Sequence, residues 1–317
     1  MVSFNPIHDI PQLNGKVILV TGGNIGLGQQ CILEYSRHNP ALIYLAARSA
    51  AKAQAAIDEI KQKLGPSNTV TIKFLELDLS SLASVRITAA KVVAEVDRLD
   101  ILMLNAGIMA SAPDLTQDGY EVQFGVNYLG HALLAKLLMP LLDKTSQLPG
   151  ADPRAIMVTS MGHQMTSKNG IEFEDLKTKC EHLGPFQRYG SSKLANILWA
   201  RHAPKEYPNI KFAAVHPGLV GGTGLGGSAT GANLAQRILM WMSPIAAVSL
   251  ENGAKNQLWA SVAEDMKTGE YYEPANIAGI ATGGVGSATG ASAMAKDDEL
   301  ARRLWDWTQG ELESFTI

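Results

Sequence analysis

The chain has 317 residues and a formal net charge of −3; hydrophobic residues make up 46% of it and charged residues 18%. No block of like charges occurs, which argues against a nucleic-acid partner or binding to an anionic membrane surface. This length allows one large hydrophobic core, and we expect a single domain over residues 1–317.

The two cysteines, Cys31 and Cys180, match neither a metal-ligand spacing nor a disulfide framework, which indicates a reducing compartment and no metal site. The N-terminal stretch lacks the apolar segment of a signal peptide. No run of about 18 uninterrupted apolar residues is found, so no membrane span is expected. These features together predict a cytoplasmic protein.

The first predicted unit is a strand, a glycine turn, a helix and a second strand. Lys16–Thr21 and Leu42–Ala47 are continuous apolar runs, typical of strands buried in a parallel sheet, and Gln29–His38 reads as a helix. Gly22–Gly28 lies between them, where a backbone turn and a helix N-terminus suit a pyrophosphate. The spacing G-x-x-x-G-x-G differs from the usual dinucleotide fingerprint, and a tight turn without a ligand is the alternative.

Arg48 follows the second strand, and Lys52 lies one helical turn further on. Dinucleotide folds place the residue that reads the cofactor ribose at this point, an acid for a 2′-hydroxyl or an arginine for a 2′-phosphate. Positions 46 and 47 carry no acid, so the two cations favour NADP(H) over NAD(H). The alternative is a solvated start of a helix.

Strands and helices continue to alternate along the chain. Further strands are predicted at Val70–Leu77, Leu99–Leu104, Ala155–Ser160 and Phe212–His216. Further helices are predicted at Ala51–Leu64, Leu82–Val96, Asp118–Asp143, Phe186–Ala200, Ser249–Val262 and Asp297–Ser314. This alternation predicts an α/β fold, a doubly wound parallel sheet with helices on both faces.

Small and polar residues follow several of these strands. Asp78 could cap a turn or hold the adenine amino group, and Asn105-Ala106-Gly107 suits a ligand that crosses the sheet edge. Ser160 ends the fifth strand, and Pro217-Gly218 follows the sixth. Asn127 lies among apolar residues of a predicted helix, where a buried amide needs partners.

Tyr189 and Lys193 are four residues apart on a predicted helix and therefore share one face. A neighbouring ammonium favours the phenolate, so we expect Lys193 to lower the pKa of Tyr189 toward neutrality. Such a pair can donate and accept protons near pH 7. Chance occurrence of this spacing on an exposed helix is the alternative.

The composition changes after Gly218. Leu219–Pro244 combines a glycine-rich stretch with an apolar segment around Met240, Trp241 and Met242; it reads either as a lid (219–244) over an apolar pocket or as plain core. Gly269–Pro274 reads as a short edge strand. Ala275–Ala293 has no apolar period and is expected to be a loop, so that residues 275–317 form a C-terminal loop and helix.

With these motifs in place, the chain resembles the short-chain dehydrogenase/reductase family from about Lys16 to Thr223. The matching parts are TGGNIGLG at Thr21–Gly28, Asp78-Leu79, NAG at Asn105–Gly107, Asn127, Ser160, YGSSK at Tyr189–Lys193 and HPG at His216–Gly218. IEFEDL at Ile171–Leu176 and the YxxSKLAN pattern are similar to the retinol dehydrogenase-like and WW-domain oxidoreductase-like branch.

The resemblance implies a role for each matching position. Tyr189 would be the general acid/base, Lys193 would bind the nicotinamide ribose, Ser160 would bind the substrate oxygen, and Asn127 would hold a water that links Lys193 to solvent. The expected cofactor-binding set is Gly22, Asn24, Ile25, Gly26, Gly28, Arg48, Lys52, Asp78, Leu79, Asn105, Ala106, Gly107, Tyr189, Lys193, Pro217, Gly218, Val220 and Thr223.

The chain departs from the family pattern in two places. The interval from Ser160 to Tyr189 is longer than in classical members, and its His163 and Met165 are candidates to reach the substrate. The glycines after Gly218 leave the placing of Thr223 open. We expect an NADP(H)-dependent oxidoreductase of an apolar small molecule, with homo-oligomerisation left open. The rival is a redox-silent isomerase, cyclase or binding protein on the same fold.

Overall fold

The structure is a computed structural model that describes residues 2–225, 229–233, 248–277, 280–288 and 290–317. Its strands are β1 (Val2–Ser3), β2 (Val17–Thr21), β3 (Leu42–Ala47), β4 (Ile72–Glu76), β5 (Ile101–Leu104), β6 (Arg154–Val158), β7 (Lys211–Val215), β8 (Glu270–Ile277) and β9 (Ile280–Ser287). Its helices are α1 (Pro6–Asp9), α2 (Gly26–Ser36), α3 (Ala50–Leu64), α4 (Leu82–Glu95), α5 (Val122–Phe124), α6 (Gly130–Ser146), α7 (Pro185–Glu206), α9 (Leu250–Val262) and α10 (Asp298–Glu311).

The strands form one nine-stranded sheet in the order β1-β9-β8-β7-β6-β5-β2-β3-β4. The ladders from β4 across to β8 are parallel, whereas β9 and β1 are antiparallel to their neighbours. From the middle of the sheet, the chain adds β2, β3 and β4 toward one side and β5, β6, β7 and β8 toward the other. The direction of winding therefore reverses between β2 and β5. The predicted doubly wound parallel sheet is therefore confirmed.

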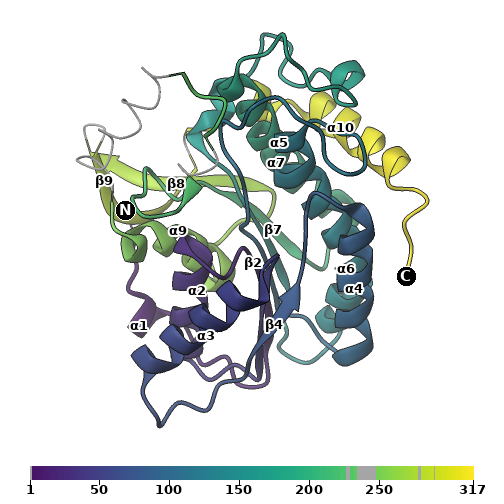
Figure 1. Cartoon of the computed structure of the whole chain (residues 1–317). Helices are drawn as coiled ribbons and strands as arrows, with labels where there is room; N and C mark the ends of the chain where they lie inside the picture. Colours follow the sequence, from purple (N-terminus) through teal and green to yellow (C-terminus); the bar gives the residue numbers. More distant parts are fainter. Residues whose placement is uncertain (1, 226–228, 234–247, 278–279, 289) are drawn as a thin grey trace.

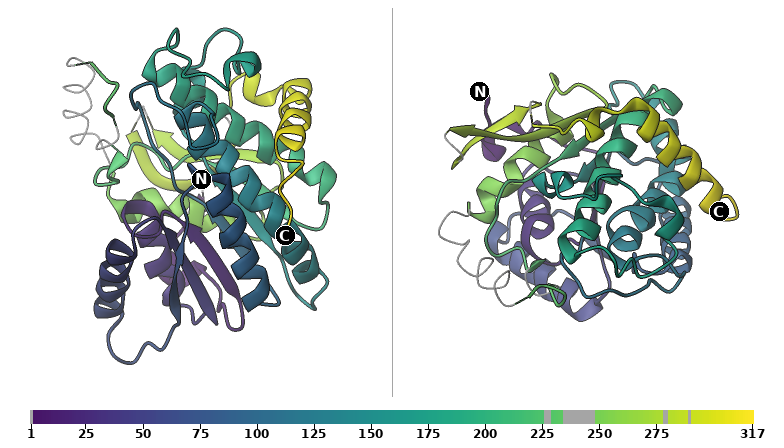
Figure 2. Two further views of the ribbon diagram at one scale, coloured as in Figure 1. Left: turned by 45° about the vertical axis from the view of Figure 1, so that its right-hand side comes forward. Right: turned by 90° about the horizontal axis from the view of Figure 1, so that it is seen from above.

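Helices cover both faces of the sheet (Figures 1 and 2). Side chains alternate across a strand, so β2 sends Val17 and Leu19 into one core and Ile18 and Val20 into the other. The first core is closed by α4, α6, α7 and α10, and the second by α2, α3 and α9. A strand buried on both faces has no polar side, which explains its continuous apolar sequence.

Two predictions for the C-terminal third are wrong. The predicted edge strand Gly269–Pro274 is an inner strand that continues to Ile277, and the predicted loop at Ala275–Ala293 contains β9, which pairs with β8. The register of this hairpin shifts between Glu273 and Ala275, where Pro274 has no N–H to donate. Main-chain pairing needs no apolar period, so the composition of this stretch concealed the strand.

The long helix predicted from Asp118 is also wrong at its start. Gly119 has a φ of +85°, and the Asp118 carboxylate accepts a hydrogen bond of 2.8 Å from the Leu82 amide, at the start of α4. Helical structure begins at Val122, and Gly125–Leu129 forms a turn of π-helix, η1, between α5 and α6. Asn127 therefore lies in a π-turn, a feature frequent at functional sites.

Gly130, the first residue of α6, offers a test of close packing against the carboxyl end of the sheet. A Cβ atom there would lie 2.5 Å from the carbonyl oxygen of Leu79. We expect Gly130→Ala to lower the free energy of unfolding by about 1–3 kcal/mol, because the overlap outweighs the better helix propensity of alanine.

Gly310 in α10 is the matched control, since a Cβ atom there meets nothing within 4 Å. Gly310→Ala should stabilise the protein by up to about 1 kcal/mol. Urea unfolding of both variants checks the pair, and equal shifts in the same direction would contradict the packing explanation.

Candidate active site

The reversal of winding between β2 and β5 leaves a crevice at the carboxyl ends of these strands, which is where open α/β sheets bind ligands. Gly22 follows β2 with a φ of +66°, and a Cβ atom on it would lie 3.0 Å from Cα of Ala106, which follows β5. A Cβ atom on Gly28 would lie 2.5 Å from the Gly22 carbonyl oxygen. The glycine turn is therefore packed too closely for side chains at these two positions.

The N-terminus of α2 is open toward this edge. Its N-cap residue, Ile25, makes no side-chain capping bond and is 51% exposed. The first N–H groups of a helix have no intrahelical partner and carry a positive partial charge, which suits an anion such as a pyrophosphate. Asn24 is partly exposed beside it, and Gly26 has a φ of +61°.

Thr21, the last residue of β2, holds the start of the Asn105-Ala106-Gly107 segment. Its hydroxyl accepts hydrogen bonds from the amides of Asn105 at 2.9 Å and Ala106 at 3.0 Å. The same hydroxyl lies 2.9 Å from Nε2 of His131, whose Nδ1 lies 3.0 Å from the carbonyl oxygen of Asn127. A carbonyl can only accept, so Nδ1 of His131 carries the hydrogen and the Thr21 hydroxyl donates to Nε2.

Burial lowers the pKa of His131 to about 4, so the ring is neutral near pH 7. The Thr21–His131 link joins the ends of β2 and β5 to the π-turn of Asn127. Sequence reasoning assigned no role to either residue. His131 occupies position i+4 from Asn127 in the sequence, and that spacing is the signal that could have found it.

The residues expected to read the adenosine half lie further along the same edge. Arg48 follows β3, Lys52 is in the first turn of α3, and both are exposed; no ion pair of either occurs in the part of the chain that the structure describes. Asp78 follows β4, and its carboxylate accepts hydrogen bonds from the amide and the hydroxyl of Ser80. Of the two predictions for Asp78, the turn cap is therefore observed. Leu79 is buried.

Tyr189, Lys193 and Ser160 converge at the ends of β6 and α7. α7 begins at Pro185, a residue favoured at the first helical position, and carries Tyr189 and Lys193 on one buried face. The Lys193 ammonium lies 5.7 Å from the centre of the Tyr189 ring and donates to the carbonyl oxygen of Val158 at 3.0 Å. The Ser160 side chain lies close enough to the Tyr189 hydroxyl to lower its pKa.

Asn127 is fully buried, and both polar atoms of its side-chain amide have hydrogen-bond partners. Its Oδ1 accepts from the amide of Ile108 at 2.8 Å, and its Nδ2 donates to the Ile108 carbonyl and the Ser192 hydroxyl, both at 2.9 Å. A Cβ atom on Gly107 would lie 3.2 Å from Asn127 Oδ1 and 3.5 Å from Lys193 Nζ. The structure thus brings all four predicted catalytic side chains to one place.

The predicted lowering of the Tyr189 pKa toward neutrality is wrong for the protein without a bound cofactor. Burial raises the pKa of Tyr189 to about 12, and the nearby Ser160 side chain acts only partly against it. Burial also lowers the pKa of Lys193 to about 7. Desolvation disfavours the charged form of each group, and it is the largest cause of both shifts.

The segment after β7 runs beside the glycine turn. Pro217 and Gly218 are partly buried, and Val220 forms a parallel bridge with Val248. A Cβ atom on Gly26 would lie 3.1 Å from Cα of Thr223, which places Thr223 beside the N-terminus of α2. Much of the predicted lid, including Met240, Trp241 and Met242, lies outside the described residues.

A small apolar cluster lies beside the first turn of α7, and we call it the entrance cluster. It consists of Met109, Ala110, Phe186, Ala229 and Ala232. Phe186 precedes Tyr189 by three residues on α7, so both lie on the same side of the helix. Ala229 and Ala232 belong to the predicted lid, so the described part of that segment packs on the 109–110 loop and the start of α7.

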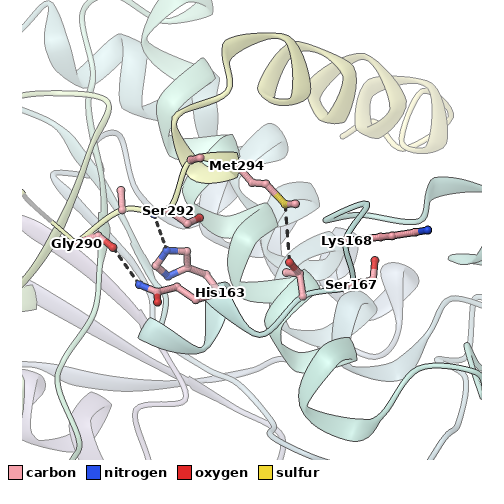
Figure 3. Close-up of a pocket in the computed structure, with 10 residues that line it drawn as sticks. His163, Ser167, Lys168, Gly290, Ser292 and Met294 are labelled. Atoms are coloured by element: carbon pink, nitrogen blue, oxygen red, sulfur yellow. Dashed lines mark hydrogen bonds between the residues drawn. The ribbon is translucent and has the colours of Figure 1, made fainter.

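The long interval before Tyr189 passes close to the site. His163 is buried, donates from Nδ1 to the Ser160 carbonyl at 2.8 Å, and accepts at Nε2 from the amide of Ser292 at 3.2 Å (Figure 3). It lines a cleft of about 500 Å³ together with residues near Met294. Both nitrogens of His163 thus bind backbone groups, whereas Met165 is 44% exposed and, like Tyr189, lies against Gly162.

Comparisons with known proteins agree with this geometry. A model of the short chain dehydrogenase family matches residues 16–173. The chain is 37% identical to the short-chain dehydrogenase/reductase drtF of Aspergillus calidoustus, over 96% of this chain and 95% of the relative. It is 33% identical to mouse retinol dehydrogenase 12, over 93% of this chain and 85% of the relative.

A crystal structure of a putative uncharacterized protein from Mycobacterium paratuberculosis superposes with a TM-score of 0.74 at 28% identity, and each chain is covered completely. The chain belongs to the short-chain dehydrogenase/reductase family, in its retinol dehydrogenase-like branch. It is therefore an oxidoreductase that uses a nicotinamide cofactor to interconvert carbonyls and alcohols of small molecules.

One described helical segment, Val122–Ser146, is long and apolar enough to cross a membrane, with a mean hydropathy of 1.2. However, 83% of its apolar window is buried inside the protein, as in a core helix of a soluble fold. Its apolar side chains pack beneath α4 and α7 in the first core.

The burial of Lys193 predicts how stability depends on pH in the protein without added cofactor. Its folded-state pKa, about 7, lies below the unfolded value, so the unfolded chain binds more protons between pH 7 and about 10. Stability should therefore rise with pH across this window, relative to Lys193→Met, by on the order of a few kcal/mol. Urea unfolding of both proteins at pH 7 and pH 9.5 measures the effect, and parallel pH profiles would refute it.

Proposed function

We propose that this protein is an NADP(H)-dependent oxidoreductase that interconverts an apolar carbonyl compound and its alcohol, with Tyr189, Lys193, Ser160 and Asn127 as its catalytic group. The observation that carries the proposal is the burial of Tyr189 beside Lys193, 5.7 Å from ring centre to ammonium, with Asn127 and Lys193 meeting at Gly107. The name of the relative retinol dehydrogenase 12 supports an apolar alcohol as the substrate class.

The residues at the sheet edge fit a dinucleotide. The open N-terminus of α2 and the side-chain-free turn at Gly22 and Gly28 suit the pyrophosphate. Arg48 and Lys52 stand exposed at the ribose position and suit a 2′-phosphate. Asn105, Ala106 and Gly107 lie on the path toward Lys193. When bound, the nicotinamide ring supplies or accepts the hydride.

Tyr189 handles the proton. Its raised pKa keeps the phenol protonated at neutral pH, so in carbonyl reduction the hydroxyl can donate a proton to the substrate oxygen. Ser160 accepts a hydrogen bond from the Gly162 amide at 3.0 Å, which fixes its hydroxyl near Tyr189. The hydroxyls of both residues can then hold the substrate oxygen and stabilise its developing negative charge.

Lys193 and Asn127 are the groups through which we expect protons to reach Tyr189. The Lys193 ammonium and the Asn127 amide oxygen both lie beside Gly107. The family resemblance implies that Asn127 holds a water that links Lys193 to solvent. The near-neutral pKa of Lys193 allows it to pass a proton in either direction.

Tyr189→Phe is expected to lower kcat by at least about 100-fold, because general acid/base catalysis is typically worth 10²–10⁴. NADPH affinity should change little, since the ring remains in place. Tyr35→Phe is the control: it removes another buried hydroxyl, one that donates to Ser261 at 2.7 Å and lies away from the site. A Tyr189→Phe enzyme with a tenth of the wild-type rate would disprove the acid/base role.

Arg48→Ala is expected to weaken NADPH binding by at least about tenfold, since a hydrogen bond to a charged group contributes about 1.5–3 kcal/mol. NADH binding should hardly change, because NADH lacks the 2′-phosphate. Arg86→Ala, which removes an exposed cation of α4, serves as the control for net charge. Titration of both cofactors decides the point, and equal losses for NADPH and NADH would mean that Arg48 does not read the phosphate.

Hydride transfer itself separates this proposal from a redox-silent isomerase, cyclase or binding protein. The enzyme is incubated with an accepted carbonyl and NADPH deuterated at C4, on each face in turn, and the product is analysed by mass spectrometry. Deuterium on the carbinol carbon from one face only is the expected result. Product without label from either face, or formed equally without NADPH, would favour the redox-silent alternative.

A further inference from the structure

Arg188, the residue before Tyr189, is buried in a way that the catalytic group does not explain. It is 3% exposed, on a helix whose neighbouring residue performs the proposed chemistry. An arginine remains charged at any physiological pH and is costly to bury without partners. Its partners therefore indicate what the burial achieves.

These partners come from three separate segments. Nη1 donates to the Leu183 carbonyl at 2.6 Å, and Nη2 donates to the Ser111 carbonyl at 2.9 Å. Nε lies 3.2 Å from Oε1 of Glu121, whose side chain is 2% exposed; the contact attracts the two charges but is not aligned as a hydrogen bond. Burial raises the pKa of Glu121, and Arg188 is among the groups that act against this shift.

Ser111 belongs to the loop that carries the entrance cluster. The Ala110 carbonyl in this loop accepts from the Gly231 amide at 2.9 Å, and the Ala112 amide donates to the Thr230 hydroxyl at 3.0 Å. A Cβ atom on Gly231 would lie 2.5 Å from the Ser111 carbonyl oxygen, the oxygen that Arg188 holds. The segment 229–232 is therefore docked on a loop whose position Arg188 determines.

Glu121, the acidic partner of Arg188, is itself held by two backbone segments. Its Oε2 accepts from the Phe124 amide at 2.7 Å and caps α5, and its own amide donates to the Leu176 carbonyl at 2.8 Å. α5 runs directly into the π-turn that contains Asn127. One buried ion pair thus joins the Tyr189 helix, the Asn127 turn and the loop of the entrance cluster.

We propose that Arg188 is a specificity-determining positioning residue, which holds the entrance cluster at a set distance from Tyr189 so that the apolar part of a long substrate packs against it. The inference rests on the proposed function. Phe186 lies about 4.5 Å along the helix axis from Tyr189, given a rise of 1.5 Å per residue. On this proposal, a ten-carbon chain held at Tyr189 reaches the cluster, whereas a three-carbon chain does not.

The test is the steady-state kinetics of Arg188→Lys with propanal and decanal as the carbonyl probes and NADPH as the reductant. Lysine keeps the charge but cannot bridge two carbonyls and a carboxylate with one planar group. We expect kcat/KM for decanal to fall at least about tenfold, mainly through KM, as for the loss of one charge-assisted hydrogen bond. The value for propanal should stay within about threefold of the wild type.

Arg154→Lys is a matched control. Arg154 is buried like Arg188, with side-chain exposures of 3% and 2%. It pairs with Asp152 and donates to the carbonyls of Ala260 and Ala263. It stands at the start of β6, however, at the amino ends of the parallel strands and away from the site. It should lower stability without changing the ratio of the decanal and propanal values. A decanal loss no larger in Arg188→Lys than in Arg154→Lys, or equal losses for both aldehydes, would overturn the proposal.

Two further measurements keep the result decisive. Glu121→Gln combined with Arg188→Gln removes both buried charges, so neither is left unpaired, and the variant should show the same selective decanal loss if Arg188→Lys does not fold. Hydrogen exchange of residues 109–112 and 229–233 should be faster in Arg188→Lys than in Arg154→Lys, and unchanged exchange would overturn the proposal. Hydrogen exchange needs no turnover, so it tests the role of Arg188 even in an enzyme that reduces neither aldehyde. Failure to reduce both aldehydes would contradict only the proposed function.

Discussion

The position of every proposed functional group depends on the parallel direction of the central strands. Parallel strands bring all their carboxyl ends to one edge, and the change of winding between β2 and β5 opens a crevice there. The glycine turn, Asn105, Ser160 and Pro217 lie on four different strand ends, up to 195 positions apart in the chain (217 − 22). The sheet brings these residues to one edge although they are far apart in the sequence.

Desolvation is the second physical effect that shapes the site. α7 buries Tyr189 and Lys193 so deeply that each prefers its neutral form, which reverses the expectation from simple charge proximity. A neutral phenol is a proton donor and a near-neutral amine can exchange protons, so burial suits the pair to the acid catalysis that we propose. The cost of burying Lys193 is partly offset by its hydrogen bond to the carbonyl oxygen of Val158.

Much of the architecture could be predicted because its sequence signals are local. β3 matches its predicted bounds, and most other strands and helices lie within a few residues of them, since doubly buried strands are continuous apolar runs between turn residues. The β8–β9 hairpin could not be found in this way. Its residues from 275 onward are mostly small and without period, and the strand pairing that orders them is made by main-chain groups, which composition does not report.

Sequence by itself determined which side chains the proposed chemistry uses, because Tyr189, Lys193, Ser160 and the glycine turn are recognisable from residue type and spacing. Tertiary structure alone decided how these groups are supported: the π-turn under Asn127, the Thr21–His131 link and the Arg188–Glu121 pair join segments with no common motif. It also decided the protonation of Tyr189 and Lys193. The physical reason is the same in each case, since hydrogen-bond partners and loss of solvent depend on which distant segments pack together, and no local pattern encodes that.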